Sequence, residues 1–379
     1  MKLYKSFSLA VCALALAACD SDDVLDDSGN VPPASESQLP SRLFVLCEGL
    51  MGGNTANLEY LDADSSIYYA NAYVKANPGT VLELGDVGND LQYYGGKLWA
   101  VINGSNKVEV VDAATLKRKG QAEVPNGRQV AFDGGFAYVT SYAGPIVDAA
   151  TGEQRGYVAK IDTATLAVVD TLHVGRQPEG IVALGGKLYV ANSGGYCTPA
   201  YEQTLSVIDL ASFRREREVT VAMNMQHIRA DRYGRLWVNS IGNYNDIAPT
   251  LCCYDTRSGQ VETWDVPVSA MTLQGDSLYI VSSTWDVTLM RSIPASAIVN
   301  VATREVVSRS MVDAAVLDAM VPYGVAVDPR THDIFVSDAR DYVSPGLLYR
   351  FAADGTLKSK VSTGSIPGHL LFVESAGRR

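Results

Sequence analysis

The residues able to carry chemistry are few and lie far apart in the chain. There are four histidines among 379 residues, and His227 and His369 each stand beside an apolar run. With Glu179 they are the candidates for acid–base catalysis or metal ligation. The sequence contains no HExxH helix motif, nucleophile elbow, CxxC pair or phosphate-cradling glycine loop. Because no acid cluster accompanies the histidines, we predict hydrogen-bonding roles for them, with no catalytic residue, no bound metal and no resident cofactor.

Two stretches rich in oxygen ligands also invite a chemical interpretation. The sequences NYND (243–246) and DARD (338–341) could hold calcium. Asn and Asp of this kind more often accept hydrogen bonds from nearby backbone N–H groups. We therefore interpret both stretches as capped loops.

Four cysteines follow Cys19 in the sequence: Cys47, Cys197, Cys252 and Cys253. Adjacent strand residues point to opposite faces, so a bridge between Cys252 and Cys253 is a poor disulfide. Cys197 falls in a loop of the preceding repeat, and the hypothesis is that it pairs with one of these two.

The elements that position these residues come from an internal repeat. One sequence segment, here called a phrase, combines a tight bend, an apolar run and a polar cluster. It occurs seven times, as in GGKLYVANSGG. Its copies span 42–53, 95–106, 134–144, 185–195, 233–243, 275–284 and 332–341. A second strand-like phrase follows each copy, and a third precedes all but the first. The missing third phrase appears at the end of the chain, as PGHLLFVES (367–375).

This pattern predicts an all-β fold, a seven-bladed β-propeller over residues 42–379. Each repeat holds about four short strands, and the roughly 40–55-residue spacing is that of propeller blades. The strand runs are apolar on both faces, as expected for blades that stack face to face. The displaced last phrase would become the innermost strand of the first blade and close the ring. Six or eight blades remain alternatives, because 297–301 and 347–351 are weak copies.

The predicted propeller has one face with short turns and one with long, varied loops. Long loops on a rigid scaffold are where binding usually occurs, and tyrosine suits ligand contact. The polar residues predicted near the axis on that face are Asn89, Asp90, Arg128, Gln129, Gln177, Glu179, Gln226, His227, Tyr323 and His369. The loop residues predicted to surround them are Asn103, Tyr142, Asn192, Tyr196, Tyr201, Asn243, Tyr244, Trp285, Asp341 and Tyr342. We predict a small-ligand site in this bowl.

The N-terminal segment indicates export and lipidation. Residues 1–18 combine a basic start with an apolar run too short to span a bilayer, which predicts a lipoprotein signal peptide ending before Cys19. Ordinary secretory cleavage is the alternative. Residues 19–41 are acidic and rich in Pro and Ser, as in a flexible tether. A net charge of −11 argues against a nucleic-acid partner.

Over residues 42–375 the chain resembles the YncE-like propeller family, through GGKLYVANSGG, VAKIDTATL and GRQPEGIVAL. Its front LFVLCEGLMGGNTANLEYLD, its tail from PYGVAVDPRTHDIFVSDARD onward and its acidic lipoprotein start resemble the cobalamin-binding BtuG family. That resemblance implies a lipid-anchored, cell-surface protein of the outer membrane. It further implies binding of cobalamin or a related corrinoid, and transfer to a TonB-dependent transporter of the BtuB type. Acids directly after the lipidated cysteine resemble the surface-export signal of some Gram-negative lipoproteins.

Two other classes of function stay open at this stage. Some propellers related to the YncE-like family act as lactonases or lyases, which would require His227, His369 or Glu179 to be catalytic. Aromatic loops with Asn and Asp edges would also suit a glycan-binding or adhesion module. A corrinoid fits the predicted face because it is a broad amphipathic disc with amide arms, complementary to aromatic rings and polar side chains.

Overall fold

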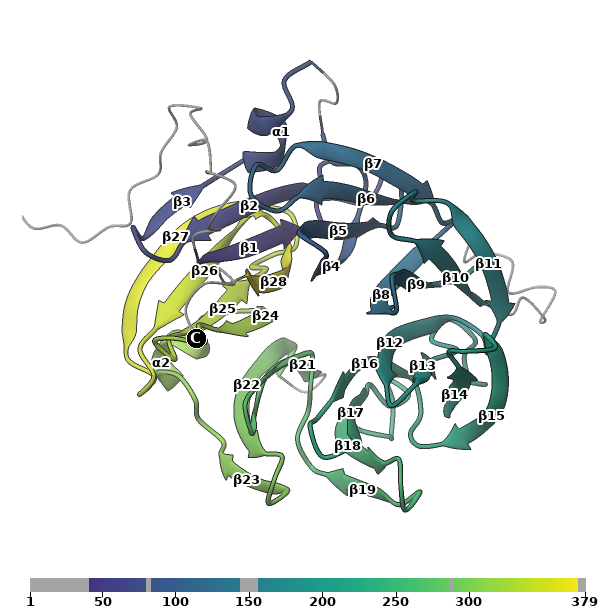
Figure 1. Cartoon of the computed structure of the whole chain (residues 1–379). Helices are drawn as coiled ribbons and strands as arrows, with labels where there is room; N and C mark the ends of the chain where they lie inside the picture. Colours follow the sequence, from purple (N-terminus) through teal and green to yellow (C-terminus); the bar gives the residue numbers. More distant parts are fainter. Residues whose placement is uncertain (1–40, 80–82, 144–155, 287–288, 374–379) are drawn as a thin grey trace, which may run out of the picture.

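The chain forms a ring of seven four-stranded antiparallel sheets around a central axis (Figure 1). The computed structural model describes residues 41–79, 83–143, 156–286 and 289–373. The predicted signal peptide and all of the tether except Ser41 lie outside the described residues. The prediction of seven blades rather than six or eight is confirmed.

The strands follow one another outward from the axis in each blade. In blades 1 to 3 they are β28 (Pro367–Val373), β1 (Arg42–Cys47), β2 (Asn57–Asp62), β3 (Ile67–Tyr69); β4 (Gly88–Tyr94), β5 (Lys97–Ile102), β6 (Lys107–Asp112), β7 (Arg118–Glu123); and β8 (Gly127–Asp133), β9 (Phe136–Ser141), β10 (Tyr157–Asp162), β11 (Val168–His173). In blades 4 and 5 they are β12 (Pro178–Leu184), β13 (Lys187–Asn192), β14 (Thr204–Asp209), β15 (Arg214–Thr220); and β16 (Met225–Ala230), β17 (Arg235–Ser240), β18 (Thr250–Asp255), β19 (Val261–Trp264).

Blades 6 and 7 complete the ring. Their strands are β20 (Ala270–Gln274), β21 (Ser277–Asp286), β22 (Arg291–Asn300), β23 (Glu305–Ser308); and β24 (Pro322–Val327), β25 (Ile334–Asp338), β26 (Pro345–Phe351), β27 (Leu357–Ser365). Two short helices, α1 (Ala72–Ala76) and α2 (Ala314–Leu317), lie in connections between blades. Neither has the length or apolar character of a bilayer-spanning helix, and the rest of the described chain holds no such helix.

The last strand closes the ring, as the displaced repeat predicts. β28 pairs antiparallel with β1, so that Phe44 lies opposite Leu371 and Arg42 opposite Val373. Because the chain end supplies the inner strand of blade 1, no blade has an unpaired strand facing the axis.

The hydrophobic core lies between the blades and not at the axis. Within the described residues, buried apolar side chains form seven clusters, one between each pair of neighbouring blades. Leu98 of β5 packs toward blade 1 and the adjacent Trp99 toward blade 3, which explains strands that are apolar on both faces. The second strand of every blade contributes an aromatic residue to this packing at an equivalent position: Phe44, Trp99, Tyr138, Tyr189, Trp237, Tyr279 and Phe335.

The two faces of the ring differ in how strands are connected. We call the face with the links between second and third strands the loop face, and the opposite one the turn face. On the turn face, Asp112, Asp162 and Asp255 each end a third strand and accept backbone N–H bonds from residues two and three positions later. This Asx capping keeps the turns short.

One predicted loop is a strand pair instead. Trp285 was predicted on a loop, but β21 and β22 continue as an extended hairpin in which Trp285 lies opposite Ser292. Thr284 and Trp285 favour extended backbone once a partner strand is present.

Candidate functional site

The inner strands bring their polar side chains together at the axis on the loop face. Nine of the ten predicted axial residues lie on β4, β8, β12, β16, β24 and β28, and Gln177 directly precedes β12. These strands surround the axis in Figure 1. A polar centre inside a ring of apolar blade interfaces is the main feature of the candidate site.

A buried ion pair links blades 3 and 4. Arg128 donates from Nε to Glu179 Oε2 at 3.0 Å and from Nη2 to Oε1 at 3.2 Å. Tyr142 also donates its hydroxyl to Glu179, and the Arg128 guanidinium lies 4.7 Å from the centre of its ring. Burial raises the pKa of Tyr142 well above its usual range. The pair is bidentate and its planar cation has a fixed orientation.

Two histidines occupy the centre in their neutral form. His227 Nδ1 lies 3.3 Å from Gln129 Nε2, which also donates to the Gln226 carbonyl at 3.0 Å. Burial, with the positive charge of Arg229 next in effect, lowers the pKa of both His227 and His369 to about 3. Near neutral pH both imidazoles are therefore uncharged and can donate or accept hydrogen bonds.

Glu48 is an axial group that the sequence prediction missed. It lies at the start of the β1–β2 connection, hydrogen-bonds to Tyr323, and has Oε1 3.9 Å from His369 Nε2. Burial raises its pKa to about 7. It carries the only charge in the 48–56 loop, and this was the signal that could have revealed it.

Asp90 and Arg229 complete the charged centre. Asp90 Oδ1 lies 3.9 Å from His369 Nδ1, whereas Glu48 faces Nε2, the other nitrogen of the same imidazole. Its other oxygen accepts the Val130 N–H at 2.9 Å, which holds β4 against β8. Burial raises the pKa of Asp90, while Arg229 counteracts this shift. The sequence prediction missed Arg229, although it lies two residues after His227 on β16, the spacing that places two side chains on one face of a strand.

Exposed apolar side chains gather around this centre. Of fifteen large apolar residues exposed in the described chain, nine lie on the loop face: Met51, Tyr196, Tyr244, Ile247, Trp285, Leu289, Met290, Tyr342 and Val343. The remaining six lie on outer strands or at a turn-face bend: Tyr93, Val168, Val169, Val261, Val307 and Leu357. The loop face therefore carries the aromatic rim that the sequence predicted.

The rim tyrosines form ring contacts. Tyr196 meets the buried Tyr142 edge to face at 6.3 Å between ring centres. Tyr201 and Tyr244 lie 6.5 Å apart, and Tyr323 meets Tyr342 at 5.8 Å. Tyr244 is 70% exposed and Trp285 is 58% exposed, so both are free to contact a ligand.

Some predicted contacts are structural instead. Asn192 is fully buried, and its amide bonds to Thr204, Ser206 and the Gly175 N–H. Both ends of this amide are therefore engaged inside blade 4, where Asn192 joins neighbouring strands.

The other predicted amides and carboxylates mostly organise loops. Asn89 donates to the Arg128 carbonyl, Asn103 to Asn126 and the Gly127 carbonyl, and Gln177 accepts from the Tyr196 N–H. Asn243 likewise bonds within its own loop. Asp341 accepts from Ser344 and Val343, and these bonds lower its pKa to about 2. The capped-loop interpretation of 243–246 and 338–341 agrees with these contacts.

No cluster of three or more His, Cys, Asp or Glu able to hold a metal occurs among the described residues. Cys47, Cys197, Cys252 and Cys253 are free thiols, so the hypothesis of a Cys197 bridge is wrong. Cys252 and Cys253 are buried in β18, whereas Cys197 lies beside the Gln177 amide.

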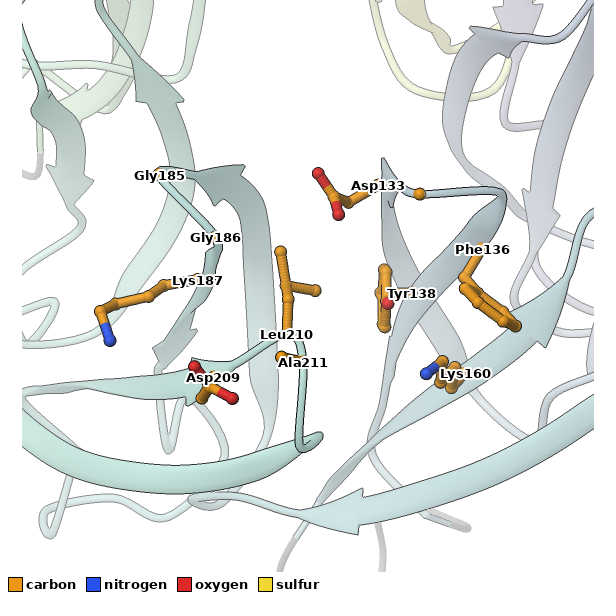
Figure 2. Close-up of a pocket in the computed structure, with 11 residues that line it drawn as sticks. Asp133, Phe136, Tyr138, Lys160, Gly185, Gly186, Lys187, Asp209, Leu210 and Ala211 are labelled. Atoms are coloured by element: carbon orange, nitrogen blue, oxygen red, sulfur yellow. The ribbon is translucent and has the colours of Figure 1, made fainter.

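A pocket of about 540 Å³ opens on the other face, between blades 3 and 4 (Figure 2). The lining comes from the β8–β9 and β12–β13 bends, from β9 and β10, and from the β14–β15 turn. None of the residues predicted for binding contributes to it.

The fold defines the chain as a seven-bladed β-propeller with a polar axis and an aromatic rim. Residues 42–365 match the family model described as a domain of unknown function (DUF5074), and the chain belongs to that family. No curated protein matches the chain.

Solved propellers share the fold at low sequence identity. Hydrazine synthase of Kuenenia stuttgartiensis is 17% identical, with a TM-score of 0.62 over 77% of this chain and 96% of that one. A quinonprotein alcohol dehydrogenase-like protein of Bacteroides thetaiotaomicron is 12% identical, with a TM-score of 0.61 over 89% of this chain and 80% of that one. A putative 6-phosphogluconolactonase of Bacteroides fragilis is 13% identical, with a TM-score of 0.60 over 90% of this chain and all of that one. These likenesses concern the fold alone.

Proposed function

We propose that this protein is a lipid-anchored cell-surface binding protein that captures a corrinoid, such as cobalamin, on its loop face. The observation that carries the proposal is the segregation of groups on that face. Hydrogen-bonding side chains occupy the axis, and exposed aromatic residues surround them. A corrinoid presents the matching arrangement, a broad disc whose amide arms need donors and acceptors.

The axial groups suit amides because they can both donate and accept. Neutral His227 and His369 offer both capacities, Glu48 and Asp90 accept, and Arg229 donates. Tyr196, Tyr244 and Trp285 offer flat apolar surface at low entropic cost. A ligand seated here would be held by polar contacts at its arms and ring contacts at its edges.

The predicted lipidation of Cys19 and the acidic segment that follows it favour a place at the outer membrane, outside the cell. A captured corrinoid would then pass to a TonB-dependent transporter of the BtuB type. The outward-facing rim is the surface that such a partner would meet. Labelling of intact cells with a membrane-impermeant reagent tests this placement, and protection of the protein from the reagent would contradict it.

Isothermal titration of the purified full-length chain with cyanocobalamin tests the ligand. We expect saturable binding at micromolar or lower concentrations, weakened by Trp285→Ala. Val261→Ala, an exposed substitution on the outer strand β19, is the matched control and leaves binding unchanged. Absence of heat at micromolar protein and ligand would overturn the corrinoid assignment.

A second candidate function is hydrolysis of a lactone, favoured by Glu48. A carboxylate with a pKa of about 7, beside His369, could act as a general base toward water. One of the solved propellers with a similar fold is a putative 6-phosphogluconolactonase. Release of acid from 6-phosphogluconolactone, abolished by Glu48→Gln, would support this activity. Equal rates for the wild type and the variant would exclude Glu48 as the base.

A further inference from the structure

The pocket on the turn face contains a lysine in an unusual place. Lys160 on β10 lies opposite Tyr138, the aromatic core residue of blade 3. The equivalent partners of the aromatic residues, from blade 1 to blade 7, are Tyr60, Val110, Lys160, Val207, Cys253, Ile298 and Arg350. Five blades have an uncharged residue here that packs between blades, so a cation at this position calls for a separate explanation.

The second cation in the series shows how such a charge is normally neutralised. Arg350 lies over Phe335 and donates to Asp333 at 2.7 Å. Lys160 has ring contacts alone: its Nζ lies 4.1 Å from the centre of Phe136 and 5.5 Å from that of Phe213. Within the described residues, no carboxylate pairs with Lys160. Aromatic faces attract an ammonium group but leave its charge uncompensated.

The pocket lies where a ligand could reach this ammonium group. Figure 2 shows Tyr138 and Phe136 on one side, Leu210 and the Gly185–Gly186 bend on the other, and Lys160 beside Tyr138. A side chain added at Gly185 or Gly186 would meet no atom within 4 Å, so these bends leave the mouth open. The volume of about 540 Å³ is in the range of small-molecule sites.

The other charges in the lining narrow the class of ligand. Lys187 is paired with Glu216 at 2.5 Å, and Figure 2 shows its Nζ pointing away from Lys160. Asp209 accepts hydrogen bonds from Ser212 in its own turn. Asp133 lines the mouth as a second carboxylate. Two carboxylates repel any anion, and they repel a multiply charged one such as a phosphate most strongly, so among anions a singly charged group pairs with Lys160 at the lowest cost.

We propose that this pocket is a second binding site, independent of the loop face, for a small monoanionic carboxylate with a flat apolar part. The carboxylate pairs with the Lys160 ammonium group, and the apolar part lies against Phe136, Tyr138 and Leu210. Lys160 thus acts as the specificity-determining residue of the site.

Isothermal titration of the full-length chain with 2-naphthoate tests the proposal, with uncharged 2-naphthamide as the reference probe. Loss of a charge-assisted hydrogen bond predicts at least about tenfold weaker binding of naphthoate to Lys160→Met. Lys160→Arg keeps the charge and should stay within about threefold of the wild type. Lys187→Met is the matched control, because its ammonium group is already paired, and it should change affinity less than about twofold.

Several outcomes would overturn the proposal. These are no naphthoate binding at millimolar concentration, equal binding to Lys160→Met, or equal binding of naphthamide and naphthoate to the wild type. The last comparison needs no variant and holds even if a substitution impairs folding. If naphthoate binds Lys160→Met as tightly as the wild type, the Lys160 stem packs on the aromatic rings while its ammonium group is solvated by water.

Discussion

The two faces of this propeller are built by the same repeat yet differ in chemistry. On the turn face, third strands end in capping carboxylates such as Asp112 and Asp162, which hold the turns near their minimum length. On the loop face, Asp341 and Asn243 also cap their loops, yet the loops are longer and more varied, and nine exposed large apolar residues collect there. The contrast shows that exposed apolar surface collects where the repeat leaves loop length unconstrained.

A second contrast lies between the axis and the outer surface. Arg128 and Glu179 form an ion pair at the axis, with side chains 20% and 5% exposed. Arg304 and Glu262 form one on the outside, with side chains 44% and 42% exposed. Removal of one partner leaves a buried charge at the axis and a solvated charge on the outside. The free energy of unfolding should therefore fall much more in the first case.

The largest expected effect is from Glu179→Ala. The Arg128 guanidinium would be left unpaired and the Tyr142 hydroxyl unsatisfied. We expect the free energy of unfolding to fall by about 3–5 kcal/mol, the usual cost of breaking a buried pair. Urea denaturation measures this change. A loss below about 1 kcal/mol would show that water reaches the pair freely.

The axial histidines should make stability fall with acidity. Their pKa is about 3 in the folded protein and 6.5 when unperturbed, so the unfolded chain binds protons first as pH drops below 6.5. Each histidine then costs about 2 kcal/mol near pH 5 relative to neutral pH, and the loss continues toward pH 3. Urea unfolding of His369→Gln at these two pH values should show a loss smaller by that amount.

Glu48 should change the pH dependence of stability in the direction opposite to the histidines, and it therefore serves as their control. Its pKa is about 7 in the folded protein against 4.5 unperturbed, so lowering the pH from 7 toward 4.5 restores stability. Glu48→Gln should therefore steepen the acid loss, by about 2 kcal/mol near pH 5. Parallel pH profiles for the wild type, His369→Gln and Glu48→Gln would contradict the buried axial cluster.

The rim should affect binding more than stability. Simultaneous replacement of Tyr196, Tyr201 and Tyr244 by Ala should weaken the binding of cyanocobalamin at least about tenfold, a loss of about 1.4 kcal/mol of binding free energy. Tyr196 and Tyr244 are 56% and 70% exposed, so unfolding should change little. Titration and urea denaturation of the same variant separate the two effects. Unchanged affinity would place the corrinoid site away from blades 4 and 5.

The smallest effect is expected for Arg304→Ala. Exposed ion pairs contribute between zero and about 1 kcal/mol because water and salt screen them. We expect a change in the free energy of unfolding below about 1 kcal/mol, further reduced by added salt. A loss similar to that of Glu179→Ala would remove the distinction between the axis and the surface.

The repeat made the ring predictable, because seven copies of one phrase and a displaced strand at 367–375 admit few arrangements. Side-chain roles were less predictable. Asn192 has the residue type of a ligand contact, but the structure buries it inside blade 4. Trp285 was predicted on a loop and lies on β21, although it is exposed on the expected face.

The sequence by itself indicated seven blades, with six or eight left open, and it indicated the closing strand and the face that carries long loops, because these follow from the repeat and its displaced last copy. Only the tertiary structure decided that Glu48, Asp90 and His369 meet at the axis, and that Lys160 has ring contacts without a carboxylate partner among the described residues. Such contacts join residues from different blades. Their distances depend on how strands twist and blades pack, and a linear pattern does not encode this.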